Sequence, residues 1–282
     1  MKKQAVHLGA VQETLLIPLI SRAVETSRQN GLLRDPRAVE IVRQLDYDFD
    51  KWKHSSNLSG ACVRTCIFDE IAIRFLEEYP DGVIVEIGCG LNTRFERIDN
   101  GKATWFDLDL PDSIELRRQF FKDTPRRTML ANSVLDEAWM EPVRKLNKPT
   151  LFLSEAVIVY LTEEQVKQAI VQIANTFPNA FFVTDTSTSK LTSPKARKKA
   201  MKRLGIKSWF QWACDDPKMV ENWYPGIKLL SSKTFADSSP EITQKMPPFW
   251  RNMLRFVPFL VRAMAKDYRI SHYQFGATAT EH

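Results

Sequence analysis

The 282-residue chain is 44% hydrophobic and 26% charged, so it can bury a sizeable core as one large domain without disulfides or metal ions. Its four cysteines form no Cys-x-x-Cys pair, and its most apolar run, residues 151–161, is interrupted by Ser154 and Glu155, which argues against a zinc site and a membrane span. The start of the sequence lacks an apolar signal core, and we expect a cytoplasmic protein with reduced thiols.

Residues 1–80 are predicted to form a helical cap that belongs to the same domain as the rest of the chain. Apolar spacing indicates helices over residues 11–28, 36–45 and 62–79. Pro18 predicts a kink or break in the first of them, and Asp35 is the expected N-cap of the second. The polar segment 46–60, which contains Trp52, is predicted to be a loop or lid.

Residues 81–282 are predicted to form the core, with strands and helices alternating along its first half. Short apolar, β-branched runs occur at residues 83–87, 103–107, 128–131, 150–154 and 180–184, with helical segments at 111–122 and 162–177. The second of these helices opens with a capping box formed by Thr162 and Gln165. The alternation predicts an α/β fold with a mostly parallel sheet and helices on both faces.

The remainder of the chain is less regular, and acceptor-site insertions are expected over residues 187–269. Residues 229–235 and 270–275 predict late antiparallel strands that close the sheet. The basic stretch 190–207 carries much of the net charge of +6, and we favour a solvated helix face over a nucleic-acid or anionic-substrate patch there. For residues 251–265, a helix packed on the domain is favoured over membrane-surface binding.

The strongest local motif is a predicted strand that runs through Glu86 into a Gly88-Cys89-Gly90 turn. Glycines in such a turn allow torsions that other residues avoid and a close approach of backbone to ligand. Open parallel sheets bind ligands beyond the carboxyl ends of their strands. A dinucleotide cradle would need a third glycine where Thr93 stands, so S-adenosylmethionine, with its cationic methionine end facing Glu86, competes with a nicotinamide cofactor.

The second predicted strand ends with Asp107 and Asp109, 21 and 23 positions after Glu86. This is close to the spacing of roughly 20 residues at which an acid binds ribose hydroxyls in dinucleotide-binding folds. A carboxylate can accept hydrogen bonds from two hydroxyls at once. We favour Asp109 for the ribose and keep Asp107 as the second choice, since either could instead cap the helix that Pro111 begins.

Taken together, these motifs and others along the chain resemble the leucine carboxyl methyltransferase superfamily, most closely the branch named for the tetracenomycin polyketide-synthesis O-methyltransferase. The matching stretches are residues 13–19, 33–38, 45–49, 64–65, 88–94, 105–111, 133–136 with Trp139, 154–156 and 160–161. The resemblance implies a class I methyltransferase with a Rossmann-like core, an N-terminal helical cap and S-adenosyl-L-methionine as cofactor, without a metal.

The resemblance also implies roles for residues of the cofactor site. Arg64 would hold the carboxylate of the cofactor, a task suited to a planar guanidinium. Gly88 would lie against the methionine moiety, and Glu155 near its amino group or sulfonium. Because a lone glutamate in an apolar run is costly to bury without a partner, Glu155 independently suggests function.

Further positions concern the adenine, the acceptor and departures from the family pattern. Ser133 and Val134 would edge the adenine, and Tyr160 lines the acceptor pocket or is an ordinary packed tyrosine. Asn92 stands where aspartate is usual, and Ala156 replaces a usual glycine after the glutamate. We expect cofactor binding to survive both changes.

No general base is evident from the residue pattern. His54, in the predicted lid, and His272, near the end of the chain, are weak candidates beside Tyr160. A carboxylate acceptor needs no base at neutral pH, whereas a phenol benefits from one.

We therefore predict O-methylation of a carboxylate or phenolic hydroxyl on a small, polyketide-like metabolite, with no nucleic-acid partner and no membrane span. The alternatives are carboxyl methylation of a protein C-terminus, an NAD-binding oxidoreductase, and a non-catalytic binding module. The sequence leaves the acceptor, the oligomeric state and the role of the basic stretch open.

Overall fold

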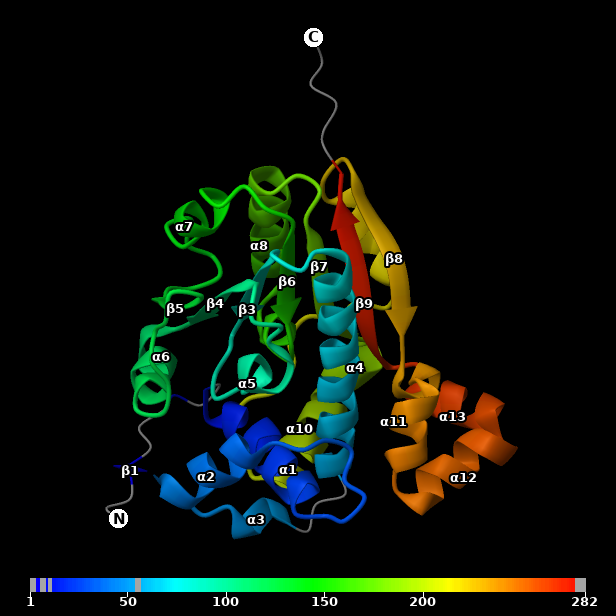
Figure 1. Cartoon of the computed structure of the whole chain (residues 1–282). Coiled ribbons are helices and arrows are strands. Elements are labelled where there is room, and N and C mark those ends of the chain that lie inside the picture. Colours follow the sequence, from blue (N-terminus) through cyan, green and yellow to red (C-terminus); the bar gives the residue numbers. More distant parts are fainter. Residues whose placement is uncertain (1–3, 6–8, 10–11, 54–56, 277–282) are drawn as a thin grey trace.

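The computed structural model describes residues 4–5, 9, 12–53 and 57–276, and it is built around a seven-stranded sheet (Figure 1). In spatial order the strands are β5 (Arg127–Ala131), β4 (Thr104–Asp109), β3 (Val83–Ile87), β6 (Thr150–Ser154), β7 (Phe181–Ser187), β9 (Tyr268–Phe275) and β8 (Ile227–Lys233). Strands β3 to β7 are parallel, and β9 is antiparallel to both of its neighbours. The predicted mostly parallel sheet and its late antiparallel closure are confirmed.

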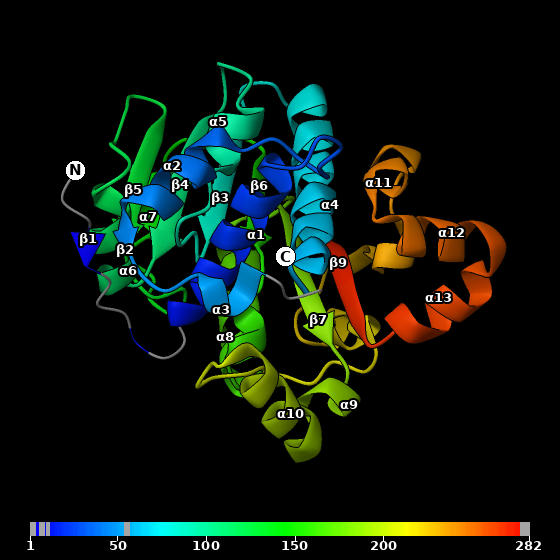
Figure 2. The same cartoon turned by 90° about the horizontal axis from the view of Figure 1, so that it is seen from below.

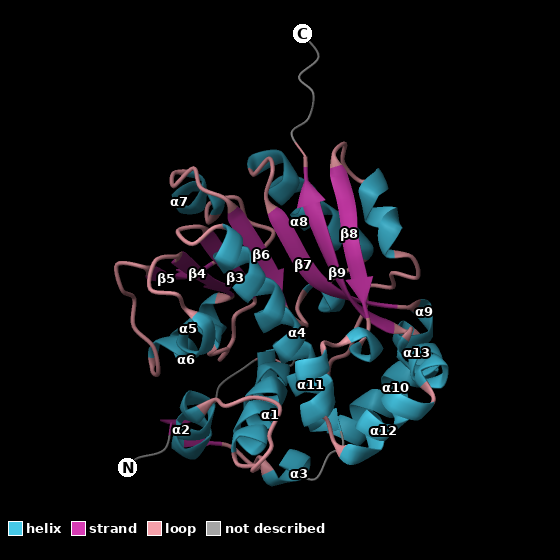
Figure 3. Cartoon of the chain, turned by 45° about the vertical axis from the view of Figure 1, so that its right-hand side comes forward, coloured by secondary structure: helices cyan, strands magenta, loops and turns pink. Residues whose placement is uncertain are grey.

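Apolar side chains on both faces of the sheet explain why helices cover both. Along β3, Val83, Val85 and Ile87 join one buried cluster, while Ile84 joins the opposite one. Helices α7 (Met140–Arg144) and α8 (Glu163–Thr176) complete the first cluster, and α4 (Asn57–Glu78) completes the second. Figure 3 shows the sheet between α4 and α8. Two short helices, α5 (Arg94–Ile98) and α6 (Pro111–Arg118), follow β3 and β4.

The N-terminal helices form the predicted cap at the carboxyl ends of the parallel strands. They comprise η1 (Gln12–Leu15), α1 (Leu16–Thr26), α2 (Pro36–Gln44) and α3 (Asp50–Lys53), with short strands β1 (Gln4–Ala5) and β2 (Leu45–Asp46) beside them. The backbone changes from 3-10 to α geometry at Leu16, so Pro18 falls in the first turn of α1, where a missing N–H is tolerated. Asp35 caps α2 as expected, since its Oδ1 accepts the Ala38 N–H at 2.9 Å.

The prediction of a loop or lid over residues 46–60 is wrong in part. Helix α3 lies within this segment, and α4 begins at Asn57, five residues before the predicted start. The reason is Trp52, which is 1% exposed and whose Nε1 donates to the carbonyl of Leu204 at 2.7 Å. This side chain fastens the segment to a helix far away in the sequence.

Residues 188–266 are mostly helical rather than irregular (Figure 2). The elements are α9 (Ser189–Thr192), α10 (Pro194–Leu204), η3 (Pro217–Asn222), η4 (Phe235–Asp237), α11 (Pro240–Lys245), α12 (Pro248–Phe256) and α13 (Pro258–Ala265). Five of them begin with proline, which fits the first turn of a helix. Ser193 and Ser239 cap α10 and α11. The division at residue 80 stays a prediction.

Candidate active site

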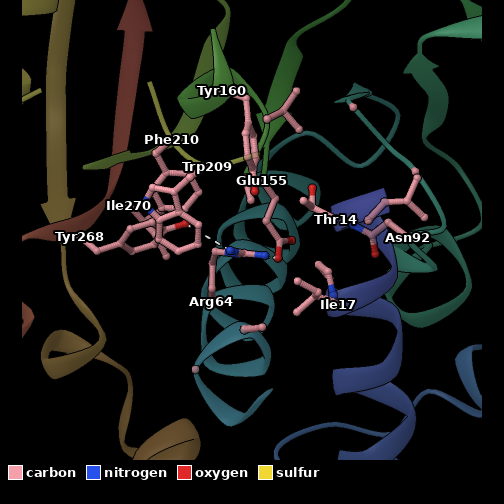
Figure 4. A pocket seen from close by; sticks show the side chains of 18 of the residues that line it. Thr14, Ile17, Arg64, Asn92, Glu155, Tyr160, Trp209, Phe210, Tyr268 and Ile270 are labelled. Atoms are coloured by element: carbon pink, nitrogen blue, oxygen red, sulfur yellow. Dashed lines mark hydrogen bonds and ion pairs between the residues drawn. The ribbon is translucent and has the colours of Figure 1, made fainter. Parts of the chain in front are cut away.

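A cavity of about 890 Å³ opens at the carboxyl ends of β3, β4 and β6, where ligands of open parallel sheets bind. Its walls come from the turns after these strands, from α1 and α4 of the cap, and from α10, η4, α12 and β9. Segments from almost the whole length of the chain therefore meet here (Figure 4). A volume of this size lies at the upper end of those common for small-molecule sites.

The glycine turn after β3 forms one side of the cavity. Gly88 and Gly90 have φ angles of +65° and +45°, in the left-handed region that favours glycine. A Cβ atom at Gly88 would lie 2.3 Å from Cγ2 of Val157, so no larger residue fits there without a shift. Both positive torsions and the close approach confirm why glycine occupies this turn.

Of the two acids at the end of β4, only Asp109 lines the cavity. Its Oδ2 accepts the Gly90 N–H at 2.7 Å and its Oδ1 accepts the Leu110 N–H at 2.7 Å, which fixes the carboxylate against the glycine turn. Burial raises the pKa of Asp109. Asp107 instead pairs with Arg117 at 2.9 Å and Arg127 at 2.6 Å inside the protein. The structure therefore places Asp109, the first choice for the ribose, at the cavity and Asp107, the second choice, in the interior.

Glu86 reaches the cavity but already has a cationic partner in the protein. Arg94, which is fully buried, pairs with Glu86, and the Asn92 side-chain amide donates to the same carboxylate at 3.3 Å. The role of Glu86 toward the methionine end of a cofactor stays a prediction, and Arg94 already compensates part of its charge.

Arg64 and Glu155 meet at the centre of the cavity (Figure 4). Arg64 Nε donates to Glu155 Oε1 at 3.0 Å, and Arg94 Nη2 pairs with Glu155 Oε2 at 2.6 Å. The Thr65 hydroxyl donates to Oε1 at 2.8 Å. Burial alone would raise the pKa of Glu155, but the two guanidinium groups lower it to about 2. Glu155 is thus a carboxylate at neutral pH.

A third acid, Asp185, was not singled out in the sequence. It lies on β7 with 0% exposure, and its carboxylate accepts the Tyr268 hydroxyl and, at 2.9 Å, the Ala156 N–H. Tyr268 lines the cavity and also accepts from Arg64 Nη1 at 3.2 Å. Burial raises the pKa of Asp185 to about 6. An acid at the end of a buried strand is the same signal that identified Glu86 and Glu155.

Aromatic rings form the wall on the far side of Arg64. Trp209 and Phe210 stack with ring centroids 4.4 Å apart, and Tyr160 meets Phe210 edge-on at 5.4 Å. Tyr160 belongs to the 3-10 turn η2 (Ile158–Tyr160) and lines the cavity, as the resemblance implies. The basic stretch contributes as well, since Lys199 and Arg203 of α10 line the same wall.

The predicted adenine edge also lies at the cavity. Ser133 and Val134 follow β5, the strand beside the one that ends with Asp109, and both residues line the cavity. The Ser133 N–H donates to Asp136 Oδ2 at 2.8 Å, and its hydroxyl accepts the Leu135 N–H at 3.2 Å. The turn is therefore held by its own hydrogen bonds.

The two histidine candidates do not join the site. His272 lies on β9 with its ring 5.7 Å from that of Phe181, and it does not line the cavity. Burial lowers the pKa of His272 to about 4, so it is neutral at pH 7. His272 is on the same face of β9 as Tyr268 and Ile270, which line the cavity, but it lies farther along the strand, beside Phe181 and beyond the cavity. His54 lies outside the described residues.

Metal-binding and membrane-spanning features are absent from the described part of the chain. Over residues 12–53 and 57–276, no three His, Cys, Asp or Glu side chains are grouped as they would be around a metal ion. Within the same residues every helix is too short or too polar to cross a bilayer. Cys62, Cys66, Cys89 and Cys214 are free and buried.

Comparisons of the sequence with known proteins identify methyltransferases. A family model for leucine carboxyl methyltransferase matches residues 16–174, more than half of the chain. The tetracenomycin polyketide synthesis O-methyltransferase TcmP of Streptomyces glaucescens is 29% identical over 245 residues, covering 84% of this chain and 90% of that protein. The S-adenosyl-L-methionine-dependent methyltransferase dpfgK of Gibberella zeae is 29% identical over 250 residues, covering 81% and 83%.

Solved structures share the fold at low sequence identity. A candidate methyltransferase from Thermobifida fusca superposes with a TM-score of 0.55 at 16% identity, covering 92% of this chain and 95% of that one. A DUF574 family protein from Streptomyces avermitilis gives the same TM-score at 10% identity, covering 92% and 97%.

Proposed function

The chain belongs to the leucine carboxyl methyltransferase family and is an S-adenosylmethionine-dependent methyltransferase, and we propose that it methylates an oxygen atom of a small aromatic acceptor. The observation that carries the proposal is the continuity of one cavity. It joins the Gly88 turn and Asp109 to the Arg64–Glu155 pair and then to the aromatic wall around Phe210. The first part suits the cofactor, and the last suits a flat acceptor.

The residues at the turn fit the chemical groups of S-adenosylmethionine. Asp109 presents a carboxylate for the two ribose hydroxyls, and Ser133 and Val134 border the space for adenine. Glu155 and Glu86, each paired with an arginine, present carboxylate oxygens to the region that the ammonium and sulfonium groups would occupy. Gly88 lines the cavity with no side chain of its own, so a ligand there would meet its backbone.

Arg64 can bind the cofactor carboxylate without giving up its protein partners. Among the described residues it donates through Nε to Glu155 and through Nη1 to Tyr268. A guanidinium has five N–H donors in a planar fork, so Nη2 remains for a ligand. We propose Arg64 for the carboxylate end and Asp109 for the ribose end.

The chain's own contribution to the reaction is alignment and exclusion of water. When bound, the cofactor supplies an activated methyl group on a sulfonium, and holding the acceptor oxygen in line with it can lower the barrier by about 7–11 kcal/mol. Trp209, Phe210 and Tyr160 offer flat faces that hold an aromatic ring in one plane.

A phenolic acceptor has a route for its proton in this proposal. The Tyr268 hydroxyl is hydrogen-bonded to Asp185 and faces the cavity. Tyr268 would take the acceptor proton while passing its own to Asp185, which is ionised above a pKa of about 6. A carboxylate acceptor would need no such transfer.

A methyl-transfer assay with labelled cofactor tests the acceptor class. Aromatic acids and phenols are offered as acceptors, and labelled products are treated with alkali, which releases methanol from esters but leaves aryl ethers intact. We expect label in the small-molecule fraction, and a raised KM for the acceptor in Phe210→Ala with unchanged cofactor affinity. Label confined to a protein fraction would instead support carboxyl methylation of a protein C-terminus and contradict the proposal.

A further inference from the structure

The hairpin formed by α12 and α13 exposes an unusual amount of apolar surface. Among the described residues, five of the nine large hydrophobic side chains that are exposed belong to this hairpin: Phe249 at 64%, Phe256 at 70%, Phe259 at 73%, Leu260 at 43% and Met264 at 54%. Scattered single apolar residues on a surface need no explanation, but a contiguous group on one hairpin marks an interaction site.

The inner side of the hairpin packs against the rest of the protein, so the exposure of its outer side does not result from loose packing. Trp250 and Leu254 of α12 pack against the buried cluster under α4, and Val261 and Ala265 of α13 are buried. Helical periodicity places Phe259 nearly opposite the buried Val261, with Leu260 and Met264 together on the flank between them. In Figures 1 and 2 the hairpin lies at the edge of the molecule, beyond α4 and β9.

The helices α12 and α13 themselves carry charges of one sign only. Residues 242–266 contain no Asp or Glu, whereas they contain five basic residues, Lys245, Arg251, Arg255, Arg262 and Lys266. All five are exposed, and of these Arg262 also contacts Asp237 of η4 at 3.5 Å. Basic side chains that flank exposed phenylalanine and leucine are typical of helices that lie in a membrane interface.

We propose that the α12–α13 hairpin docks on the surface of an anionic membrane, with Phe256 and Phe259 inserted below the headgroups and Arg255 and Lys266 on the lipid phosphates. Anionic lipid attracts each nearby basic residue and apolar insertion adds to this attraction. A second copy of the chain is a poorer occupant, because a two-fold contact through this surface would bring the same cationic groups face to face.

Docking in this orientation brings the cavity to the membrane. Met246, Pro247 and Trp250, at the start of the hairpin, line the cavity described above. An apolar acceptor that partitions into the bilayer would then enter from the lipid side without crossing water.

Vesicle flotation with the full chain tests the proposal. We expect binding to vesicles of equal parts phosphatidylcholine and phosphatidylglycerol, little binding to phosphatidylcholine alone, and weakening by salt. The double variant Phe256→Ser, Phe259→Ser should lose binding roughly tenfold or more, since each ring contributes its burial. The double variant Arg255→Glu, Lys266→Glu should lose it as well.

Matched variants keep the test specific to the hairpin. Leu230→Ser removes an exposed leucine of β8, and Lys198→Glu with Lys202→Glu reverses charge on α10. Both should bind vesicles like wild type, and all variants should keep wild-type near-ultraviolet circular dichroism. Absence of binding by wild type, or equal losses in hairpin and control variants, overturns the proposal. A wild-type dimer that Phe256→Ser, Phe259→Ser makes monomeric, without vesicle binding, would assign the surface to a second copy.

Discussion

The cofactor half and the acceptor half of the cavity are built on different principles. The cofactor half contains a buried ionic cluster in which Arg94, with 0% exposure, contacts three carboxylates, Asp69, Glu86 and Glu155. The acceptor half, residues 188–266, is described throughout and has no buried charged side chain. It consists of short helices begun by proline and capped by serine. The first half is stabilised by ion pairs in which removing one charge leaves its partners uncompensated. The second half is stabilised by local helix caps and aromatic packing.

This difference separates what the protein must keep from what it can vary. A buried charge pair is strongly destabilising to break on one side, because the remaining charge is left uncompensated. Short capped helices lose only local stabilisation when a residue changes. We infer that the ionic cluster keeps the residues that contact the cofactor in position, while the helical half determines which acceptor is bound. The predictions below test this contrast from the largest effect to the smallest.

Removing the central arginine should produce the largest loss of stability. Arg94→Met leaves Asp69, Glu86 and Glu155 without their shared cation, and we expect the free energy of unfolding to fall by about 3–5 kcal/mol. Arg197→Met, on the exposed side of α10, should change it by no more than about 0.5 kcal/mol. Urea denaturation measures both. Similar values for the two variants would remove the contrast between the halves.

Acid should weaken the cofactor half through Glu155. Its pKa in the folded protein is about 2, below the ordinary value of 4.5 for a glutamate, so the folded state binds this proton less tightly than the unfolded state. The resulting stabilisation, on the order of 3 kcal/mol, is complete above pH 4.5 and is lost as the pH falls toward 2. Unfolding free energies of wild type and Glu155→Gln should therefore converge as the pH falls from about 5 toward about 2. A gap between them that is constant with pH would contradict this account.

Gly88 and Gly205 separate backbone torsion from close packing. Both have positive φ, +65° and +63°, but a Cβ atom meets Val157 at Gly88 and nothing within 4 Å at Gly205. We expect Gly205→Ala to cost about 1 kcal/mol from torsion alone and Gly88→Ala about 1–3 kcal/mol more from overpacking. Thermal and chemical denaturation provide the comparison. Equal losses of stability in the two variants would show that a methyl group fits at Gly88 without overpacking.

The smallest expected effect is a gain in stability. Ala156 has a φ of +56°, a conformation that favours glycine. Ala156→Gly should raise the free energy of unfolding by about 0.5–1 kcal/mol, with the hydrogen bond from residue 156 to Asp185 retained. Ala263→Gly, in the exposed part of α13, should lower it by about 1 kcal/mol. The same sign for both changes would be inconsistent with strain at Ala156.

Much of the cofactor half was predictable from sequence because its signals are local. The strand over residues 83–87, the glycines after it and the acid at Asp109 follow one another within a short stretch, and each requirement can be stated from the chain alone. The capping box at Thr162 and Gln165 is equally local and is present.

The remainder depends on contacts between distant residues. Asp107 is bound by Arg127 from the neighbouring strand, and Glu86 by Arg94, and no pattern in the sequence states which charges pair. Tyr268 reaches Asp185, 83 positions before it in the sequence, because β9 returns beside β7. The sequence already favours a helix for residues 190–207 and for residues 251–265, where α10, α12 and α13 lie. The elements η3, η4 and α11 were missed because each is only one or two turns long, so apolar periodicity has no room to appear.

The central claim is that the cofactor spans the cavity from Asp109 to Arg64, and calorimetric titration with S-adenosylhomocysteine tests it most directly. We expect Asp109→Asn and Arg64→Ala each to weaken binding roughly tenfold or more, since each removes a charged hydrogen-bonding partner. Asp112→Asn, a nearby acid outside the cavity lining, should bind like wild type. Wild-type affinity in both Asp109→Asn and Arg64→Ala would contradict the account.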